Sequence, residues 1–157
     1  MKNSFVVISA MLLAGCQSMH STSESSIWFK VKPGSRLVLN KALEIPSGQA
    51  HIKLQKGEVT GGVDEYTINC SFEVRNLGPQ TVNPDSFTIT NSSSQREWVS
   101  RPDTINFYKV FRLQSAQQAD VEKLFCGYWD GPLFGKPVTM EDVQQALGEY
   151  FTFEFAK

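Results

Sequence analysis

The residues of this sequence best able to do chemistry are three cysteines and two histidines. The cysteines are Cys16, Cys70 and Cys126, and the histidines are His20 and His51. A thiol can carry a lipid, form a disulfide or bind a metal, and an imidazole can act as a base or a ligand. No Cys-x-x-Cys pair is present, and two histidines are too few for an ordinary zinc site. We therefore expect no metal and no cofactor.

Cys16 closes an apolar leader. Lys2 gives a positive start, and residues 5–15 form an apolar run that ends in two small residues. At about 1.5 Å per residue the run spans roughly 16 Å, half of a bilayer core, so it is too short for a transmembrane helix. Leu13-Ala14-Gly15-Cys16 resembles the lipobox of bacterial lipoprotein precursors, which implies cleavage before Cys16 and lipidation of its thiol. The alternative is an ordinary secretory signal with an incidental Cys16.

The leader divides the chain into three parts. Residues 1–15 are the expected signal peptide, and residues 16–26 are the lipidated cysteine with a flexible tether rich in Ser, Thr and Gln. Residues 27–157 are long enough for a single β-rich domain with its own core. The net charge is −1 and neither half of the chain is strongly basic, which argues against a nucleic-acid partner.

Export also determines the expected state of the other two cysteines. With Cys16 assigned to the lipid, Cys70 and Cys126 remain as an even pair in a compartment where thiols oxidise. We predict a Cys70–Cys126 disulfide, which would close a long loop and stabilise the domain by about 4 kcal/mol in the chain-entropy model. A reactive thiol pair and a metal site are the alternatives.

Most of the domain alternates apolar and polar residues, which is typical of half-buried strands. The clearest run is residues 66–75, in which Cys70 and its apolar neighbours at every second position share one face. Stretches 57–62 and 91–95 are expected to be a loop and a polar turn. Further strands are expected at residues 27–31, 37–45, 49–55, 87–89, 96–100, 105–113 and 150–155.

A short helix is expected near the C-terminus. Thr139 can cap it, two acids follow in the first turn, and Gly148 ends it. Residues 115–129 are ambiguous, because Ser115 and Gln118 have the spacing of a capping box while the following run is β-rich and apolar. We predict a strand over residues 121–129, with a helix as the alternative. The resulting fold class is mainly β: an antiparallel β-sandwich or small barrel of about nine short strands with one short helix.

Parts of the domain resemble small proteobacterial envelope lipoproteins. The resemblance lies in Leu113-x-Ser115, in Leu124-x-Cys126-x-x-Trp129, and in the helix from Thr139 to Ala146-Leu147-Gly148. It implies a cell-envelope location and no particular activity.

Catalytic signatures are absent from the sequence. There is no GxSxG, HExxH, SxxK or dinucleotide fingerprint, and a Ser-His-Asp triad would need either His20 in the tether or His51 on an exposed strand face. A hydrolase with paired carboxylates remains an alternative because acids are scattered along the chain. The aromatic residues can form a carbohydrate platform or, as we expect, pack in the β core; they are Trp28, Trp98, Trp129, Tyr108 and Tyr128.

These observations lead us to expect a non-enzymatic binding or assembly module of the cell envelope. It would be held to the membrane at Cys16 and would bind an envelope protein or a cell-wall component, for instance through an open strand edge. A structural or stress-related lipoprotein without a dedicated ligand is the alternative. Gln17, where inner-membrane lipoproteins of enterobacteria carry Asp, implies by resemblance an outer-membrane anchor with the domain in the periplasm of a Gram-negative host.

Overall fold

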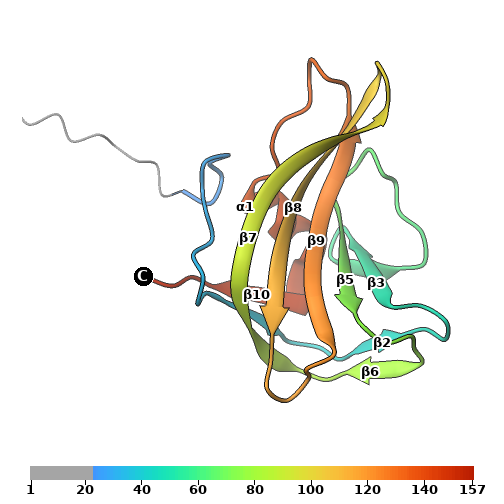
Figure 1. The fold of residues 1–157 in the computed structure, drawn as a ribbon, viewed down its shortest axis with the longest axis vertical. Coiled ribbons are helices and arrows are strands. Elements are labelled where there is room, and N and C mark those ends of the chain that lie inside the picture. Colours follow the sequence, from blue (N-terminus) through green and yellow to red (C-terminus); the bar gives the residue numbers. More distant parts are fainter. Residues whose placement is uncertain (1–22) are drawn as a thin grey trace, which may run out of the picture.

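The computed structural model describes residues 23–157. The leader, Cys16 and residues 17–22 of the expected tether, with His20, lie outside the described residues. Residues 23–157 form ten β-strands, one α-helix and one short 3₁₀ helix, so the predicted mainly-β class is confirmed (Figure 1). The elements are β1 (Arg36–Leu39), β2 (Leu43–Ile45), β3 (His51–Gln55), β4 (Glu58–Thr60), β5 (Asn69–Val74), β6 (Gln80–Val82), β7 (Asp85–Ser100), β8 (Thr104–Gln114), β9 (Val121–Asp130), α1 (Met140–Leu147), η1 (Gly148–Tyr150) and β10 (Phe151–Glu154).

Eight of these strands form one antiparallel sheet in the order β10-β1-β7-β8-β9-β5-β3-β4, and β2 and β6 form a second small sheet. The large sheet curls strongly. Phe72 on β5 lies 5.3 Å from Phe151 on β10, measured between ring centroids, although several strands separate β5 from β10 in the sheet. Figure 1 shows β7, β8 and β9 as long bent strands with α1 behind them. The apolar core fills the concave side.

The helix is built as the sequence predicts. Thr139 caps it through a reciprocal capping box: its Oγ1 accepts from the backbone N–H of Asp142, and the Asp142 carboxylate accepts from the backbone N–H of Thr139. The apolar stripe is almost fully buried against β3, β5 and β10; it comprises Met140, Val143, Ala146 and Leu147. Because α1 covers the concave side of the sheet, it is an integral part of the core.

The ambiguous stretch is a strand. Residues 121–130 form β9 in the middle of the large sheet, which confirms the prediction over its alternative. Ser115 and Gln118 do act as a cap, but of a turn: the Ser115 hydroxyl accepts from the backbone N–H groups of Gln117 and Gln118 between β8 and β9. The capping spacing therefore has a local role, and pairing with β8 makes the next residues a strand.

Several predicted boundaries are wrong. Residues 27–31 alternate in polarity but form no strand, because no neighbouring strand pairs with them and Val31 is their only buried member. The expected run 37–45 is two strands, β1 and β2, in different sheets. The expected loop 57–62 contains β4, which pairs with β3. The expected strand 66–75 begins at Asn69, and residues 148–150 form η1 before β10.

The largest error concerns β7. The expected turn at residues 91–95 lies inside one continuous strand, which pairs with β8 from Thr88 to Ser100. Polar residues suit this position because β7 leaves the core after a bulge between Ile89 and Asn91. None of the β7 residues after Ile89 is buried. The β7–β8 hairpin consequently projects beyond the rest of the sheet (Figure 1).

Candidate functional site

The disulfide is present as predicted. Cys70 on β5 and Cys126 on β9 lie directly opposite each other, are fully buried, and are joined by a disulfide bond. Their Cα atoms are 4.0 Å apart, which is the close spacing of a non-hydrogen-bonded antiparallel pair. This bond is enclosed by the core, so its role in the domain is structural.

An uncovered strand edge is the most extended feature that the fold leaves open. On its outer side β7 pairs with β1 only from Asp85 to Thr88, and Ile89 is then bonded to the backbone of Gly34 and Ser35. From Asn91 to Ser100 this side of β7 has no strand partner within residues 23–157. An unpaired edge of this length is a template for another extended chain.

The pairing pattern determines which backbone groups face outward. Because Cys70 and Cys126 are a non-hydrogen-bonded pair, the N–H and C=O of Cys126 point away from β5, toward Lys109 on β8. Lys109 and Cys126 are thus a hydrogen-bonded pair, and the N–H and C=O of Lys109 point to β9. Ser94, which lies opposite Lys109 on β7, therefore directs its own N–H and C=O away from β8. The uncovered edge thus offers free hydrogen-bonding groups at Ser94 and at every second residue around it.

A pocket lies beside this edge on the concave side of the sheet. It has a volume of about 440 Å³ and is bounded by residues 27–30, by residues 92–94 of β7, and by Lys109 and Pro137. A second hollow of about 330 Å³ adjoins it, since Ser94 and Pro137 line both. Arg96, Phe107 and other residues complete the second hollow. The two hollows lie one after the other along β7, the first at residues 92–94 and the second at residues 94–96.

Residues 23–31 form the outer wall of the first pocket. The chain is fixed at both ends: Glu24 accepts from the backbone N–H of Met140 and from the Gln144 side chain, and the Val31 carbonyl accepts from the Ser92 hydroxyl. Residues 23–26 were expected to belong to the tether, and they contact α1. The wall between these ends carries Trp28, whose side chain is 80% exposed.

Lys109 is the one charged residue that is buried within residues 23–157, with 2% of its surface exposed. It lies within the expected strand 105–113, and its neighbours Phe107 and Phe111 are buried on the same side of β8. Burial lowers the pKa of the Lys109 ammonium, and the carboxylate of Asp142 opposes that shift. The Asp142 carboxylate is itself bound to Thr139, 2.7 Å from its hydroxyl.

His51, the candidate base that lies within residues 23–157, is not part of a catalytic cluster. His51 lies on β3 opposite Glu73, and the Glu73 carboxylate is paired with Lys123 at 2.9 Å. Within residues 23–157 no hydrogen bond joins the His51 ring to a serine or an acid, and no group of three potential ligands could hold a metal ion. The expected hydrolase alternative gains no support from this arrangement.

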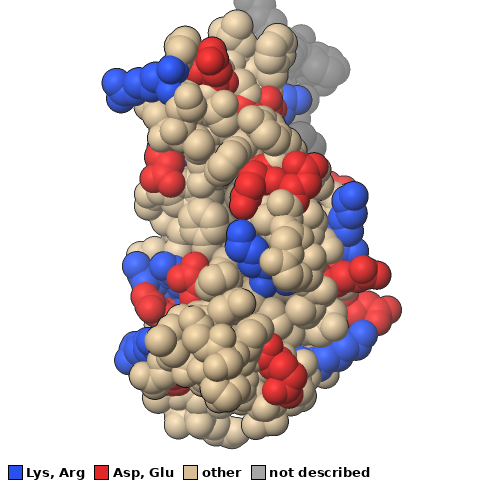
Figure 2. All heavy atoms as spheres, turned by 90° about the vertical axis from the view of Figure 1, so that its right-hand side faces the viewer, with Lys and Arg blue, Asp and Glu red and all other residues tan. Residues whose placement is uncertain are grey.

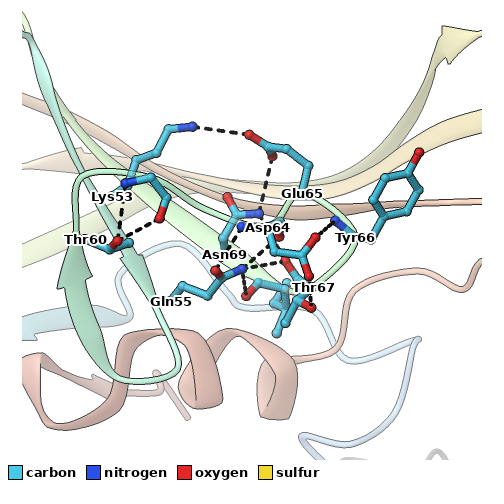
Figure 3. Close-up of polar contacts among 10 residues, drawn as sticks. Lys53, Gln55, Thr60, Asp64, Glu65, Tyr66, Thr67 and Asn69 are labelled. Atoms are coloured by element: carbon cyan, nitrogen blue, oxygen red, sulfur yellow. Dashed lines mark hydrogen bonds and ion pairs between the residues drawn. The ribbon is translucent and has the colours of Figure 1, made fainter.

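The most connected polar cluster serves the fold. Gln55 on β3 holds the loop before β5: its amide donates to the carbonyls of Asp64 and Thr67, at 2.8 and 3.1 Å, and accepts from the Asp64 N–H (Figure 3). Glu65 bridges Lys53 and Asn69 in the same cluster. These groups bind one another, so the loop before β5 is held against β3.

The surface charges are dispersed. Figure 2 shows acidic and basic side chains interspersed over one face, without a continuous patch of either sign. A hollow of about 630 Å³ is lined partly by Arg75 and Arg112, but Arg112 is paired with Glu122 at 2.7 Å. The pocket at Lys109 differs, because no ion pair within residues 23–157 reaches the Lys109 ammonium.

No protein-family model matches this chain, and neither a curated protein nor a solved structure matches it. None of the helices within residues 23–157 is long and apolar enough to span a membrane. The assignment of a function therefore depends on the features of this chain alone.

The aromatic residues follow the expected core packing only in part. Tyr128 packs against Phe107 at the core, whereas Trp129 makes an edge contact with the exposed Tyr66. Trp28 and Trp98 are exposed; Trp28 lines the pocket beside β7, and Trp98 lies on β7 itself. Sequence reasoning missed this edge because its polar composition indicates a turn. A lysine among the alternating apolar residues of 105–113 is the signal that could have pointed to the pocket.

Proposed function

We propose that this chain is a lipid-anchored envelope protein whose β domain binds another envelope protein by strand addition along β7. The lipobox at residues 13–16 supports the anchor, and the Cys70–Cys126 disulfide supports an oxidising compartment. The observation that carries the binding role is the outer edge of β7 from Asn91 to Ser100, which has no partner among residues 23–157. In strand addition such an edge supplies main-chain hydrogen bonds to an extended segment.

The sequence suggests where this partner is met. Cys16 would carry the lipid, and Gln17 after it favours the outer membrane, with the domain in the periplasm. The edge includes Trp98 and Val99, which are 44% and 42% exposed and add apolar contact area to the backbone groups. The charged residues Arg96 and Glu97 precede Trp98 on the same strand, and charges on an edge strand limit unspecific pairing with other copies of the chain.

Proline at position 94 tests the strand-addition role. Since the Ser94 N–H faces away from β8, Ser94→Pro removes a donor from the edge without removing a bond to β8, and proline is tolerated at such edge positions. Ser94→Ala is the matched control, because it changes the side chain and keeps the N–H. We expect Ser94→Pro to lose the partner and Ser94→Ala to retain it, with both variants folded by circular dichroism.

Photo-crosslinking in intact cells provides the readout. A benzophenone amino acid replaces Gln95 on the β7 edge in one strain and Gln114 on β8 in another, since both glutamines are exposed but β8 is paired on both sides. We expect a crosslinked protein from position 95 that is absent from position 114 and disappears with Ser94→Pro. A crosslink that survives Ser94→Pro would contradict strand addition. A complete lack of specific crosslinks would favour the structural or stress-related alternative.

A further inference from the structure

The pocket at Lys109 has the properties of a small-molecule site, independent of the β7 edge function. Lys109 points to the concave side of β8, between Ser94 on β7 and the disulfide residue Cys126 on β9. It lines the 440 Å³ pocket together with residues of the N-terminal wall. A buried lysine at the floor of a pocket needs an explanation, because a desolvated ammonium group is unfavourable unless an anion or acceptor compensates it.

Within residues 23–157 this compensation is incomplete: the Asp142 carboxylate favours the Lys109 ammonium electrostatically but forms no ion pair with it. No hydrogen bond or ion pair within residues 23–157 reaches the Lys109 ammonium, whereas every fully enclosed polar side-chain atom of these residues has a partner. The ammonium group therefore keeps contact with solvent, and the pocket is where it can do so. Asp142 is the nearby acid, and its carboxylate is held by the Thr139 backbone and hydroxyl in the helix cap.

The walls determine what kind of anion fits. Ile27, Trp28, Phe29 and Pro137 are apolar or aromatic, and Phe107 continues this character into the adjoining hollow. Neither hollow has an aspartate or glutamate in its lining. The first has Lys30 besides Lys109, and the second has Arg96. Cations are disfavoured there, and a ligand with a single negative group and an apolar body matches the surroundings.

We propose that this pocket binds a monocarboxylate with an apolar body, its carboxylate at the Lys109 ammonium and its body against Trp28 and Phe29. The Lys109 ammonium and the Ser94 hydroxyl, which lies on the same face of the sheet, match one carboxylate, whereas the Ser92 hydroxyl already donates to the Val31 carbonyl. A longer body can extend past Ser94 and Pro137 into the adjoining hollow. Aliphatic and aromatic acids share this chemistry.

Direct titration tests the proposal with defined probes. The full chain, in a nonionic detergent at constant concentration with detergent blanks, is titrated calorimetrically with octanoate and 4-phenylbutyrate. Octanol and 4-phenylbutanol are the neutral counterparts, and octyl phosphate is the dianionic one. We expect at least one of the acids to bind at least about tenfold more tightly than its alcohol, because a charge-assisted hydrogen bond is lost with the alcohol. The better acid of the two identifies the body that the pocket prefers.

Two variants locate the site. Lys109→Met removes the ammonium and keeps the length and apolar stem, so it should weaken acid binding at least about tenfold and leave alcohol binding unchanged. Trp28→Ala should weaken acids and alcohols alike, and its exposed position makes misfolding no concern. Lys32→Met is the control, since Lys32 is exposed and does not line the pocket, and it should bind as the native chain does.

Chemical labelling gives a second, independent readout. Bound acid should protect Lys109 from acetylation, measured by mass spectrometry, while the labelling of Lys32 stays constant. Equal affinity for acids and alcohols, or unchanged acid binding by Lys109→Met, would overturn the proposal. Tenfold tighter binding of octyl phosphate than of octanoate would overturn its carboxylate assignment. None of these results depends on whether the Ser94→Pro variant loses a protein partner.

Discussion

Gly57 and Gly148 are packed back to back where the helix meets the sheet. Gly57 lies in the turn between β3 and β4, Gly148 ends α1, and a Cβ on Gly148 would overlap the Gly57 Cα atom. The Gly57 N–H also donates to the Ala146 carbonyl at 3.0 Å, which satisfies one of the free carbonyls at the helix end. Both glycines have positive φ, so this contact needs glycine for backbone conformation and for space.

Alanine at position 148 should therefore be strongly destabilising. Gly148→Ala combines an unfavourable positive φ with a backbone clash, and we expect a loss of about 3 kcal/mol or more in the free energy of unfolding. Gly34→Ala is the matched control, because Gly34 also has positive φ but nothing lies near its missing Cβ. That control should cost about 1–2 kcal/mol. Urea unfolding of both variants measures the difference, and equal losses would show that the contact is unimportant.

The disulfide should contribute much of the stability of the domain. Replacing both Cys70 and Cys126 by alanine removes a cross-link between residues far apart in sequence, and we expect a loss of about 4 kcal/mol. Urea unfolding of the double variant, beside the native chain with and without reductant, measures it. Reductant should shift the native chain toward the double variant and leave the double variant unchanged. A reductant effect on the double variant would point to a role for Cys16 instead.

Lys109 should lower stability at neutral pH. Burial depresses its folded-state pKa below the ordinary value of 10.5, so between the two pKa values the unfolded chain holds more protons. The contribution of Lys109 to stability therefore rises as pH increases through that window. Lys109→Met should be more stable than the native chain at pH 7, and the difference should shrink toward pH 10.5.

The comparison with Lys109→Met is needed because other groups titrate nearby. Burial raises the pKa values of Tyr108 and Tyr128, and these groups reduce stability as pH rises above their ordinary value of 10.0. Asp142, the acid that acts on Lys109, is present in both chains. Thermal unfolding of both chains from pH 7 to 10.5 gives the difference curve. A Lys109→Met variant less stable than the native chain at pH 7 would mean that the ammonium has a stabilising partner.

The helix cap offers a smaller and local test. Thr139→Ala removes the hydroxyl that accepts from the Asp142 N–H and donates to its carboxylate, and we expect a loss of about 1 kcal/mol. Thr139→Ser keeps the hydroxyl and should cost only a few tenths of that value. Equal losses in the two variants would assign the effect to the threonine methyl group.

Local features of this protein could be predicted from its sequence alone. The helix from Met140 to Leu147 depends on a cap, an apolar stripe and a terminal glycine that are all close in sequence. The alternation around Cys70 indicated a strand with the cysteine inward, and Cys126 was the one other cysteine left once Cys16 was assigned to the lipid. These signals are short-range, and the local physical chemistry that produces them is the same in the folded chain.

Tertiary structure decided what depends on distant neighbours. Residues 27–31 and 91–95 show that polarity alone does not decide strand formation: the first alternates without a strand to pair with, and the second is polar but paired with β8. The uncovered edge of β7 exists because β1 begins only at Arg36, opposite Thr88, and Lys109 is buried because β7, β9 and the N-terminal wall enclose it. A strand needs a partner and a pocket needs opposing walls, and the fold supplies both from residues far apart in sequence.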